Sequence, residues 1–326
     1  MLVEKVSFEG NMERMRLGRS GLSVPRISLG TNNFGGPQLN QEASNRIMAH
    51  AVELGIDMFD TADIYTGGES ERIIGEFIKD NREDVIIATK AGKEGDVGRV
   101  AAPNKASVSR KNIMYRLEQS LKRLQTSYVD LYYVHKYDQD IPLEETMTTL
   151  DSLVKQGKIR YIACSNYTRE QIVESKSVAQ RLGLENFVAV QNKYNLISRE
   201  METDVIPYCA ENGVGTLAFS PLASGFLAGR YEQGKPPPAG SRGSYRSLPW
   251  LEKYSKGTEF QKLDRLKEIA AKTGVEVSVL ALSWILRDQQ VTGAIVGASD
   301  PKQLDESAKA VDVKLSSEDL DILNSL

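Results

Sequence analysis

Four side chains that could move a proton follow short apolar runs in the first half of the chain. Asp60 closes one such run, Tyr65 lies shortly after it, and Lys90 and His135 close the next two runs. A phenol has a pKa of about 10, which a nearby ammonium group lowers. A carboxylate keeps a buried ammonium charged. An imidazole can hydrogen-bond a carbonyl oxygen, so the set could protonate an alkoxide formed by hydride addition.

Each of the four residues also has an ordinary structural explanation. Asp60 could cap the following turn, Tyr65 could be a half-buried aromatic, Lys90 a surface lysine and His135 a satisfied core histidine. The residue types alone leave several reaction classes open. The hypothesis of a shared site therefore depends on the elements that position them.

Eight short apolar runs alternate with stretches that carry a helical apolar stripe. The runs are nearly continuous in Val, Ile, Leu and Ala, which is typical of parallel strands covered by helices. They are Ile27–Gly30, Ile56–Thr61, Val85–Thr89, Val129–His135, Tyr161–Ser165, Val188–Gln191, Gly215–Phe219 and Gly293–Val296. Helices are predicted over Glu42–Leu54, Ser109–Leu124, Leu143–Gln156 and Glu259–Lys272, with Gly157 and Gly274 as stop signals. This alternation predicts an α/β fold, either a closed barrel or a doubly wound sheet.

Two features favour a (β/α)8 TIM barrel. The segment 29–36 after the first strand does not match the G-x-G-x-x-G fingerprint of a Rossmann fold. The chemically capable side chains stand at the carboxyl ends of different strands, where barrels place their active sites. Residues Leu17–Leu22 predict an N-terminal β-hairpin turn that closes the other mouth. We expect residues 1–11 to be a flexible extension and residues 12–326 to form one domain.

The composition of the chain argues against several classes of binding partner. The chain has 41 basic and 44 acidic residues, a net charge of −3 and no basic run, which argues against nucleic acid. No apolar stretch is long enough for a membrane span, and the acidic N-terminus is unlike a signal peptide. Cys164 and Cys209 are far apart and the chain has only 2 histidines, so no metal site is predicted. We expect a cytoplasmic protein that could form a homo-oligomer.

A long segment between Ala223 and Gly257 interrupts the alternation. It contains Pro236, Pro237 and Pro238, several glycines, and three arginines at positions 230, 242 and 246. A structureless segment of this length in a compact domain is usually functional or mobile. It is either a loop that clasps a phosphate-bearing cofactor or a disordered surface excursion.

An ordered series of motifs resembles the aldo-keto reductase family, closest to the branch of aryl-alcohol dehydrogenase-like reductases and potassium-channel β-subunits. The motifs span nearly the whole chain from Met12 onward, and as an ordered set they are specific. They are RLGRSGL (16–22), FDTADIY (59–65), GESE (68–71), ATK (88–90), DLYYVH (130–135), CSNY (164–167), QNKYN (191–195), FSPL (219–222) and VGAS (296–299).

The resemblance implies a barrel that binds NADP and reduces aldehydes, ketones or sugars reversibly. It implies that Tyr65 is the general acid, with Lys90, Asp60 and His135 in support. It implies cofactor contacts from Gly30, Thr31, Asn32, Asp60, Ser165, Asn166, Gln191, Phe219, Ser220, Leu222, Gly225, Leu227, Arg230, Arg242, Gly297, Ser299, Gln303, Glu306 and Ser307. The expected substrate pocket consists of Asn32, Tyr65, His135, Lys136 and Tyr137.

The adenosine end of the predicted site departs from the family pattern. Many relatives carry a basic residue near Asp300 or Gln303 to hold the 2′-phosphate, and Ser307 replaces a usual asparagine. NAD therefore stays open beside NADP. Two other functions also stay open: a nucleotide-binding regulatory subunit with slow reductase activity, and a metal-dependent barrel hydrolase.

Overall fold

All eight apolar runs form strands of one closed parallel barrel, which confirms the TIM-barrel prediction. The structure is a computed structural model that describes residues 10, 12–92, 107–239, 241–244 and 248–325. The strand order is β10-β3-β4-β5-β6-β7-β8-β9, and the strand ends differ from the predicted ones by a residue or two. The strands are β3 (Ile27–Gly30), β4 (Met58–Asp60), β5 (Ile86–Ala91), β6 (Val129–Val134), β7 (Ile159–Ser165), β8 (Ala189–Lys193), β9 (Gly215–Phe219) and β10 (Gly293–Gly297).

The barrel closes where the last strand pairs with the first. Strand β10 runs parallel to β3, and Gly297 lies opposite Gly30 in the register. A side chain at position 30 would press on Ile295, because a Cβ there would come within 3.0 Å of the Ile295 Cγ2. The two strands therefore approach closely at the carboxyl end of the barrel.

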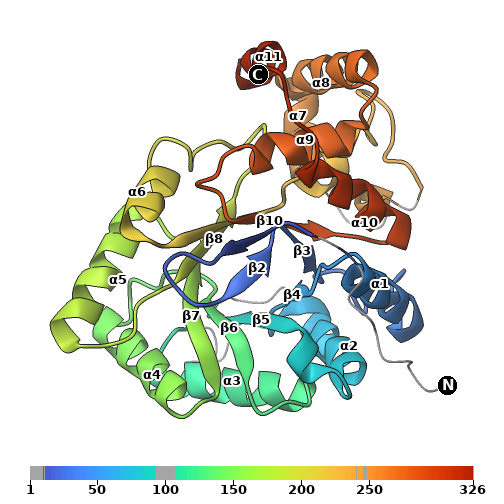
Figure 1. Ribbon diagram of the computed structural model, residues 1–326. Coiled ribbons are helices and arrows are strands. Elements are labelled where there is room, and N and C mark those ends of the chain that lie inside the picture. Colours follow the sequence, from blue (N-terminus) through green and yellow to red (C-terminus); the bar gives the residue numbers. More distant parts are fainter. Residues whose placement is uncertain (1–9, 11, 93–106, 240, 245–247, 326) are drawn as a thin grey trace.

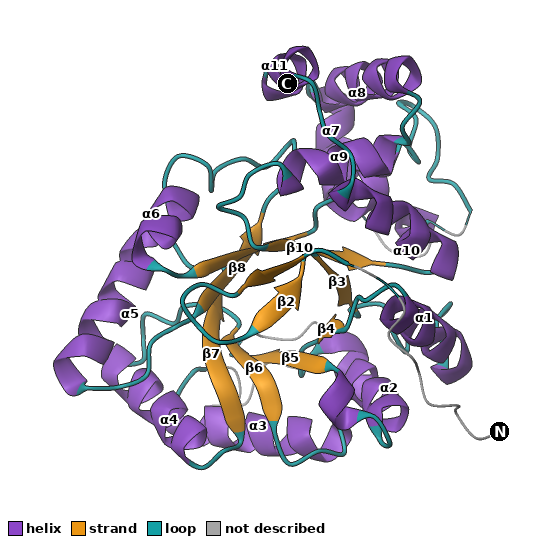
Figure 2. Ribbon diagram, in the orientation of Figure 1, coloured by secondary structure: helices purple, strands orange, loops and turns teal. Residues whose placement is uncertain are grey.

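Helices surround the strands (Figure 2). They are α1 (Gln41–Glu53), α2 (Glu69–Ile78), α3 (Arg110–Arg123), α4 (Leu143–Lys155), α5 (Arg169–Leu182), α6 (Val205–Asn212), α7 (Pro249–Lys256), α8 (Glu259–Thr273), α9 (Val277–Leu286), α10 (Pro301–Ala308) and α11 (Ser317–Asn324). The four helices predicted from their stripes are α1, α3, α4 and α8. Gly157 and Gly274 adopt the left-handed conformation directly at the ends of α4 and α8, as predicted.

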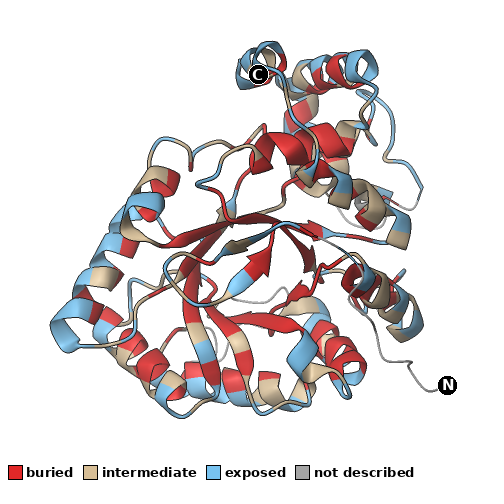
Figure 3. Ribbon diagram, viewed as in Figure 1, coloured by how far each residue is buried: buried red, intermediate tan, exposed pale blue. Residues whose placement is uncertain are grey.

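Burial follows the expected pattern of a barrel. The strands are almost wholly buried, whereas the surrounding helices turn one side to solvent (Figure 3). The exception is α9, whose residues after Val277 are all buried because it packs between the barrel and the C-terminal helices. Within the described residues, no single helix has both the length and the apolar character needed to cross a bilayer.

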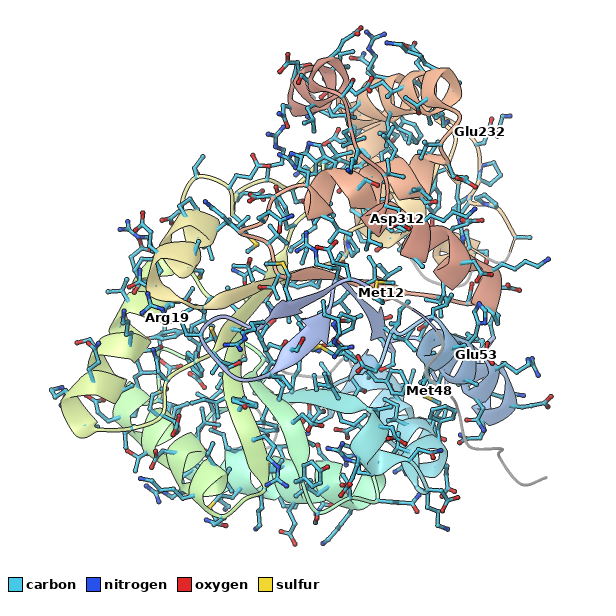
Figure 4. All side chains as sticks on the ribbon, in the orientation of Figure 1. Met12, Arg19, Met48, Glu53, Glu232 and Asp312 are labelled. Atoms are coloured by element: carbon cyan, nitrogen blue, oxygen red, sulfur yellow. The ribbon has the colours of Figure 1, made fainter. Side chains whose placement is uncertain are left out.

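The predicted hairpin closes the amino-terminal mouth of the barrel. Strands β1 (Arg14–Arg16) and β2 (Ser23–Pro25) pair antiparallel and lie across the front of the barrel in the view of Figure 1. The side chains of Leu17 and Val24 join the inner cluster formed by the barrel strands, and both are 0 % exposed. The turn residue Arg19, labelled in Figure 4, donates its N–H to the carbonyl of Gly213 at 2.8 Å.

Truncation of a buried side chain in this hairpin tests the contribution of the hairpin to stability. The Leu17→Ala variant removes a fully buried side chain and leaves a cavity at the barrel mouth, so we expect it to lower the free energy of unfolding by about 3 kcal/mol. Denaturant titration measures the loss. The Leu182→Ala variant is the control, because Leu182 is 42 % exposed on the surface. Equal losses of unfolding free energy in both variants would show that packing of the hairpin in the barrel mouth contributes nothing to stability.

The expectation that residues 223–257 lack structure is wrong. The segment contains two short 3-10 helices, η3 (Ala223–Ala228) and η4 (Arg242–Ser244), and the helix α7. Aromatic packing holds the segment together: the ring centroids of Trp250 and Tyr254 on α7 lie 6.1 and 5.0 Å from that of Phe226 on η3. Trp250 and Tyr254 are four residues apart and so share one face of α7. The prolines and glycines masked this short amphipathic helix.

Part of the predicted organisation concerns residues outside the described ranges. The proposed extension over residues 1–11 includes one described residue, Gly10, and is otherwise outside them. Arg246 also lies outside the described residues, as does the side chain of Arg242.

Candidate active site

A cavity of about 910 Å³ opens at the carboxyl ends of the barrel strands. Most strands contribute a residue at their ends, among them Gly30, Asp60, Gln191, Phe219 and Gly297. Parallel strands all point their carboxyl ends to one rim, so residues distant in sequence meet there. Within this cavity the structure brings together most of the side chains singled out from the sequence.

A buried ion pair lies at the base of the cavity. The Nζ of Lys90, at the end of β5, is 2.5 Å from Oδ1 of Asp60 and donates to the Thr61 carbonyl at 2.8 Å. Gln191 donates to the other Asp60 oxygen at 2.7 Å. The side chains of Lys90 and Asp60 are 0 % and 4 % exposed. Both oxygens of the buried carboxylate thus accept hydrogen bonds.

The electrostatics of this pair favour a charged lysine. Burial by itself lowers the pKa of Lys90, but the Asp60 carboxylate and the Tyr65 hydroxyl outweigh burial and hold the pKa of Lys90 above its ordinary value. Burial raises the pKa of Asp60, and Lys90 and Gln191 oppose that rise. A charged ammonium therefore stands beside the carboxylate.

Tyr65 lies next to this ammonium group. It begins the 3-10 helix η1 (Tyr65–Gly68), and its ring centroid is 5.2 Å from the Lys90 Nζ. The ring of His135 meets that of Tyr65 edge-on, with centroids 6.2 Å apart. His135 is 5 % exposed and follows directly after β6. A phenol, an imidazole and a buried cation thus converge on one wall of the cavity.

Two polar residues after β7 continue this wall. Asn166 donates from Nδ2 to the carbonyl of His135 at 2.9 Å and to Oγ of Ser165 at 3.0 Å. Asn166 has a φ of 58°, in the left-handed region that few residues other than glycine adopt. The strained backbone directs the amide toward the residue before it and toward the His135 carbonyl.

The segment after β9 curls around the next part of the cavity. Ser220, Ala223 and Ser224 all have positive φ values, and Gly225 follows them in the same region. Asn195 donates to the Ser220 carbonyl at 2.9 Å and holds the start of this turn. Turns of this kind form concave backbone surfaces that favour anions. Arg230 and Phe219 also line this part of the cavity.

The far end of the cavity is formed by β10 and the start of α10. The Ser299 N–H donates to Oε1 of Gln303 at 3.0 Å, and Oγ of Ser307 donates to the Gln303 carbonyl at 2.7 Å. Asn33 donates to the Ala298 carbonyl at 3.2 Å. In the described part of the chain, Oδ1 of Asn33 and Oγ of Ser241 are buried without a hydrogen-bond partner. Both residues line the cavity, which is therefore polar at this end.

Most of the residues predicted from the sequence line this cavity. They are Gly30, Thr31, Asn32, Asp60, Tyr65, His135, Ser165, Asn166, Gln191, Phe219, Ser220, Leu222, Gly225, Arg230, Gly297, Ser299, Gln303, Glu306 and Ser307. Lys90 lies behind Asp60 and reaches the site through the ion pair.

Three predicted residues lie elsewhere. Leu227 is 2 % exposed and packs in the core, and its N–H donates to the Leu222 carbonyl at 3.1 Å. Lys136 is exposed and is not part of the cavity lining. Tyr137 turns away, since its hydroxyl donates to Glu174 at 2.9 Å and its ring packs against Tyr167. Neither Lys136 nor Tyr137 therefore forms a wall of the cavity as the structure describes it.

Several lining residues escaped prediction from the sequence. They are polar or small and belong to the loops after β3, β4 and β9 and to α9: Asn33, Gln38, Thr66, Gly67, Ser224, Tyr231, Ser241 and Ser278. Position after a strand end was a usable signal for Asn33 and Thr66. Ser278 lies on an apolar helix and gave no signal, because only the tertiary packing brings α9 to the cavity.

Comparison with known proteins agrees with this geometry. The model of the aldo/keto reductase family matches residues 26–326. The chain is 36 % identical to a probable voltage-gated potassium channel subunit beta of Oryza sativa subsp. japonica, over 93 % of this chain and 92 % of that one. It is 34 % identical to a versiconal hemiacetal acetate reductase of Aspergillus parasiticus, over 96 % of each chain. It is also 34 % identical to an uncharacterized oxidoreductase of Bacillus subtilis (strain 168), over 97 % and 96 %.

Proposed function

Since the chain belongs to the aldo/keto reductase family of oxidoreductases, we propose that it reduces aldehydes or ketones to alcohols, reversibly, with NADPH as the hydride donor. The observation that carries the proposal is the fully buried Lys90 ammonium, held by Asp60 beside the Tyr65 ring at the base of a large cavity. Such a cation makes an adjacent phenol a better acid, which carbonyl reduction requires.

The protein residues supply the proton and orient the carbonyl. Tyr65 donates its hydroxyl proton to the oxygen of the substrate, and Lys90 stabilises the phenolate that remains. Asp60 keeps Lys90 charged and in place. His135 hydrogen-bonds the carbonyl oxygen and aligns it with the Tyr65 hydroxyl. In alcohol oxidation the same groups act in reverse, with Tyr65 as the base.

The cavity fits a dinucleotide. Its volume of about 910 Å³ is at the upper end of ligand pockets, which span about 300–1,000 Å³. Ser165, Asn166 and Gln191 would bind the carboxamide of the nicotinamide, and Phe219 would stack on the ring. The turn from Ser220 to Gly225, with Arg230, would hold the pyrophosphate. Gly297, Ser299, Gln303, Glu306 and Ser307 would surround the adenosine. When bound, the nicotinamide supplies or accepts the hydride.

A substrate screen tests the proposal directly. Purified protein is mixed with NADPH and, side by side, with NADH, and a panel of aromatic, aliphatic and sugar aldehydes is added. We expect loss of the reduced-nicotinamide absorbance with at least one carbonyl class. Binding of the cofactor without turnover on any carbonyl would reject the reductase and favour the second candidate below.

Charge at the start of α10 sets the choice between NADPH and NADH. Asp300 caps α10, with its side chain accepting from the Lys302 N–H at 2.9 Å. Its negative charge opposes a 2′-phosphate held near Ser299 and Gln303. The Asp300→Asn variant keeps a capping side chain, so we expect it to raise the kcat/KM ratio of NADPH to NADH about fivefold, equal to about 1 kcal/mol.

The control for this variant removes a charge farther along the chain. Asp312, labelled in Figure 4, is exposed beyond the short helix η5 (Lys309–Val311) and does not line the cavity. We expect Asp312→Asn to leave the ratio unchanged. High salt should also reduce the effect of Asp300→Asn, because added ions screen charges at the surface. A ratio that stays constant in both variants would show that Asp300 plays no part in the choice.

The second candidate is a nucleotide-binding regulatory subunit with slow chemistry. The observation that favours it is the likeness to the protein from rice that is named as a probable potassium channel β-subunit. The two candidates share the same cavity and differ in rate. A single-turnover measurement separates them, since a regulatory subunit would hold the oxidised cofactor long after one slow reduction.

A further inference from the structure

The turn that carries Tyr65 is conformationally strained. The three residues that follow it have φ values of 47° for Thr66, 69° for Gly67 and 91° for Gly68. A left-handed threonine costs energy and persists only where the surrounding structure enforces it. One support is local: the Thr66 hydroxyl donates to the Phe34 carbonyl at 2.6 Å. The position of the Tyr65 hydroxyl therefore depends on what else holds this turn.

Two arginines of α3 fasten the segment on both sides of Tyr65. Arg116 lies 3.1 Å from Oδ2 of Asp63, two residues before the tyrosine. Arg123 lies 2.7 Å from Oε2 of Glu71, after the turn. Arg116 and Arg123 are two helical turns apart and so face the same side. Helix α3 thus holds the Tyr65 segment through two ion pairs, one before the tyrosine and one after the turn.

Of the two ion pairs, the one made by Asp63 lies closer to Tyr65 and Lys90 in the sequence and in the backbone hydrogen bonds. Its side chain is 1 % exposed, and its N–H donates to the carbonyl of Lys90 at 3.1 Å. Tyr65 in turn donates its N–H to the Ala62 carbonyl at 3.1 Å, within the same turn. A displacement of Asp63 therefore moves the backbone of both Tyr65 and Lys90.

The Asp63 carboxyl group is poised to change charge near neutral pH. The groups that act on it are Arg116 and Arg123 from α3, Glu71 from α2 and the backbone N–H of Ile64. Burial raises the pKa of the Tyr132 hydroxyl on β6, and Asp63 adds to that rise. Burial raises the pKa of Asp63 to about 7, Arg116 opposes the rise, and Glu71 adds to it. Among the described residues, Oδ1 of Asp63 is buried without a hydrogen-bond partner, so a proton on this oxygen would displace no hydrogen bond.

We propose that Asp63 and Arg116 are positioning residues for Tyr65, and that turnover requires the ionised form of Asp63. The ionised carboxylate holds Arg116 through a charge-assisted bond and fixes the strained turn. The protonated form loses the charge of that bond, and the turn relaxes away from the geometry needed for proton transfer. The inference rests on the proposed function, since turnover is its main measurement.

Stability and turnover respond to pH in opposite directions under this proposal. The pKa of Asp63 is higher in the folded state than its ordinary value, so the folded state binds this proton more tightly than the unfolded chain does. The contribution of Asp63 to stability therefore grows as pH falls through about 7 and is lost as pH rises through it. Turnover falls as pH drops through the same range. A residue with a purely structural role would lower both together.

The test measures kcat, KM and thermal stability of the full chain on both sides of neutral pH, with saturating NADPH and the best carbonyl from the screen. For Asp63→Asn we expect kcat at mildly basic pH to fall about tenfold to a hundredfold. We expect the NADPH Kd, measured by fluorescence quenching, to stay as in the wild type. The neutral step in the kcat profile should disappear. A variant that keeps the wild-type kcat and the same step would overturn the proposal.

The matched control is Asp57→Asn. Asp57 directly precedes β4, accepts two bonds from Arg14 at 2.9 and 3.0 Å, and also has a pKa raised by burial. It lies at the opposite mouth of the barrel from the cavity. We expect this variant to keep the wild-type kcat and pH step. A loss of kcat equal to that of Asp63→Asn would show that general loosening of the barrel suffices, and would overturn the proposal.

Arg116→Gln decides the question if Asp63→Asn does not fold. Without the guanidinium the ionised Asp63 carboxylate has no Arg116 to hold, so we expect kcat to fall as in Asp63→Asn and its neutral step to disappear. An unmoved step would overturn the proposal.

If the wild type turns over no carbonyl, the proposed function fails, and ¹³C NMR of the Tyr65 ring decides the inference alone. A Tyr65 signal that titrates at neutral pH in the wild type but not in Asp63→Asn supports it, and a signal that does not respond overturns it.

Discussion

We expect the Tyr65→Phe variant to lose carbonyl reduction by a factor of about 100 to 10,000 while it still binds NADPH. The variant removes one oxygen and leaves the ring that packs edge-on against His135 and lies beside Lys90. Without the hydroxyl, the substrate oxygen loses the proposed proton donor beside the buried cation. Steady-state NADPH oxidation measures the rate, and fluorescence quenching measures the binding.

The control for this prediction is Tyr137→Phe. Tyr137 lies near the rim of the barrel, but its hydroxyl donates to Glu174 on α5 and its ring is outside the cavity lining. We expect this variant to turn over at the wild-type rate. Unchanged turnover in Tyr65→Phe would exclude the tyrosine as the proton donor, whatever the control shows.

The Lys90→Met variant should suffer the largest loss of stability. It leaves the Asp60 carboxylate 4 % exposed with no cation beside it, and breaking a buried pair in this way costs about 3–5 kcal/mol. Denaturant titration measures this loss. Turnover should fall as well, since nothing then stabilises the phenolate. Lys256→Met is the control, because Lys256 and its partner Glu252 are each 73 % exposed and such pairs contribute about 1 kcal/mol or less.

A double variant separates the two effects of Lys90→Met. Combined with Asp60→Asn, it removes both charges, and replacement of both members of a buried pair is far less costly than removal of one. We expect most of the stability to return while turnover stays low. If stability stayed as low as in the single variant, the loss would come from packing around the Lys90 side chain and not from an unpaired carboxylate.

The fold was predictable because strand and helix patterns in this chain are strong and local. Near-continuous apolar runs identify β5 and β6, and the hairpin could be placed from one short turn, RLGRSGL. The helix α7 was not predictable. Its eight residues begin with a proline and follow a stretch rich in proline and glycine, and its stability comes from Trp250 and Tyr254 packing on Phe226. That contact is tertiary and leaves no periodic signal.

The candidate site was predictable where a residue ends a strand, and less so elsewhere. Asp60 and Lys90 were identified because strand ends share one rim, whereas Gln191 was named from the family resemblance; the contacts of all three follow from that topology. Tyr137 was misplaced because the direction of a side chain three residues past the strand depends on its partners, here Glu174 and Tyr167. Asp63 was quoted only as part of a motif, since its half-buried partner Arg116 is 53 positions away.

The seam between β3 and β10 links occupancy of the cavity to closure of the barrel. Gly30 and Gly297 lie opposite each other across this seam, and both line the cavity. A nascent polypeptide on the ribosome cannot form that wall until β10 has emerged. A dinucleotide that contacts both strands would bind only the finished barrel and would stabilise it by mass action. Its capture thus follows closure of the barrel, and dialysis against cofactor-free buffer should speed proteolysis at the seam.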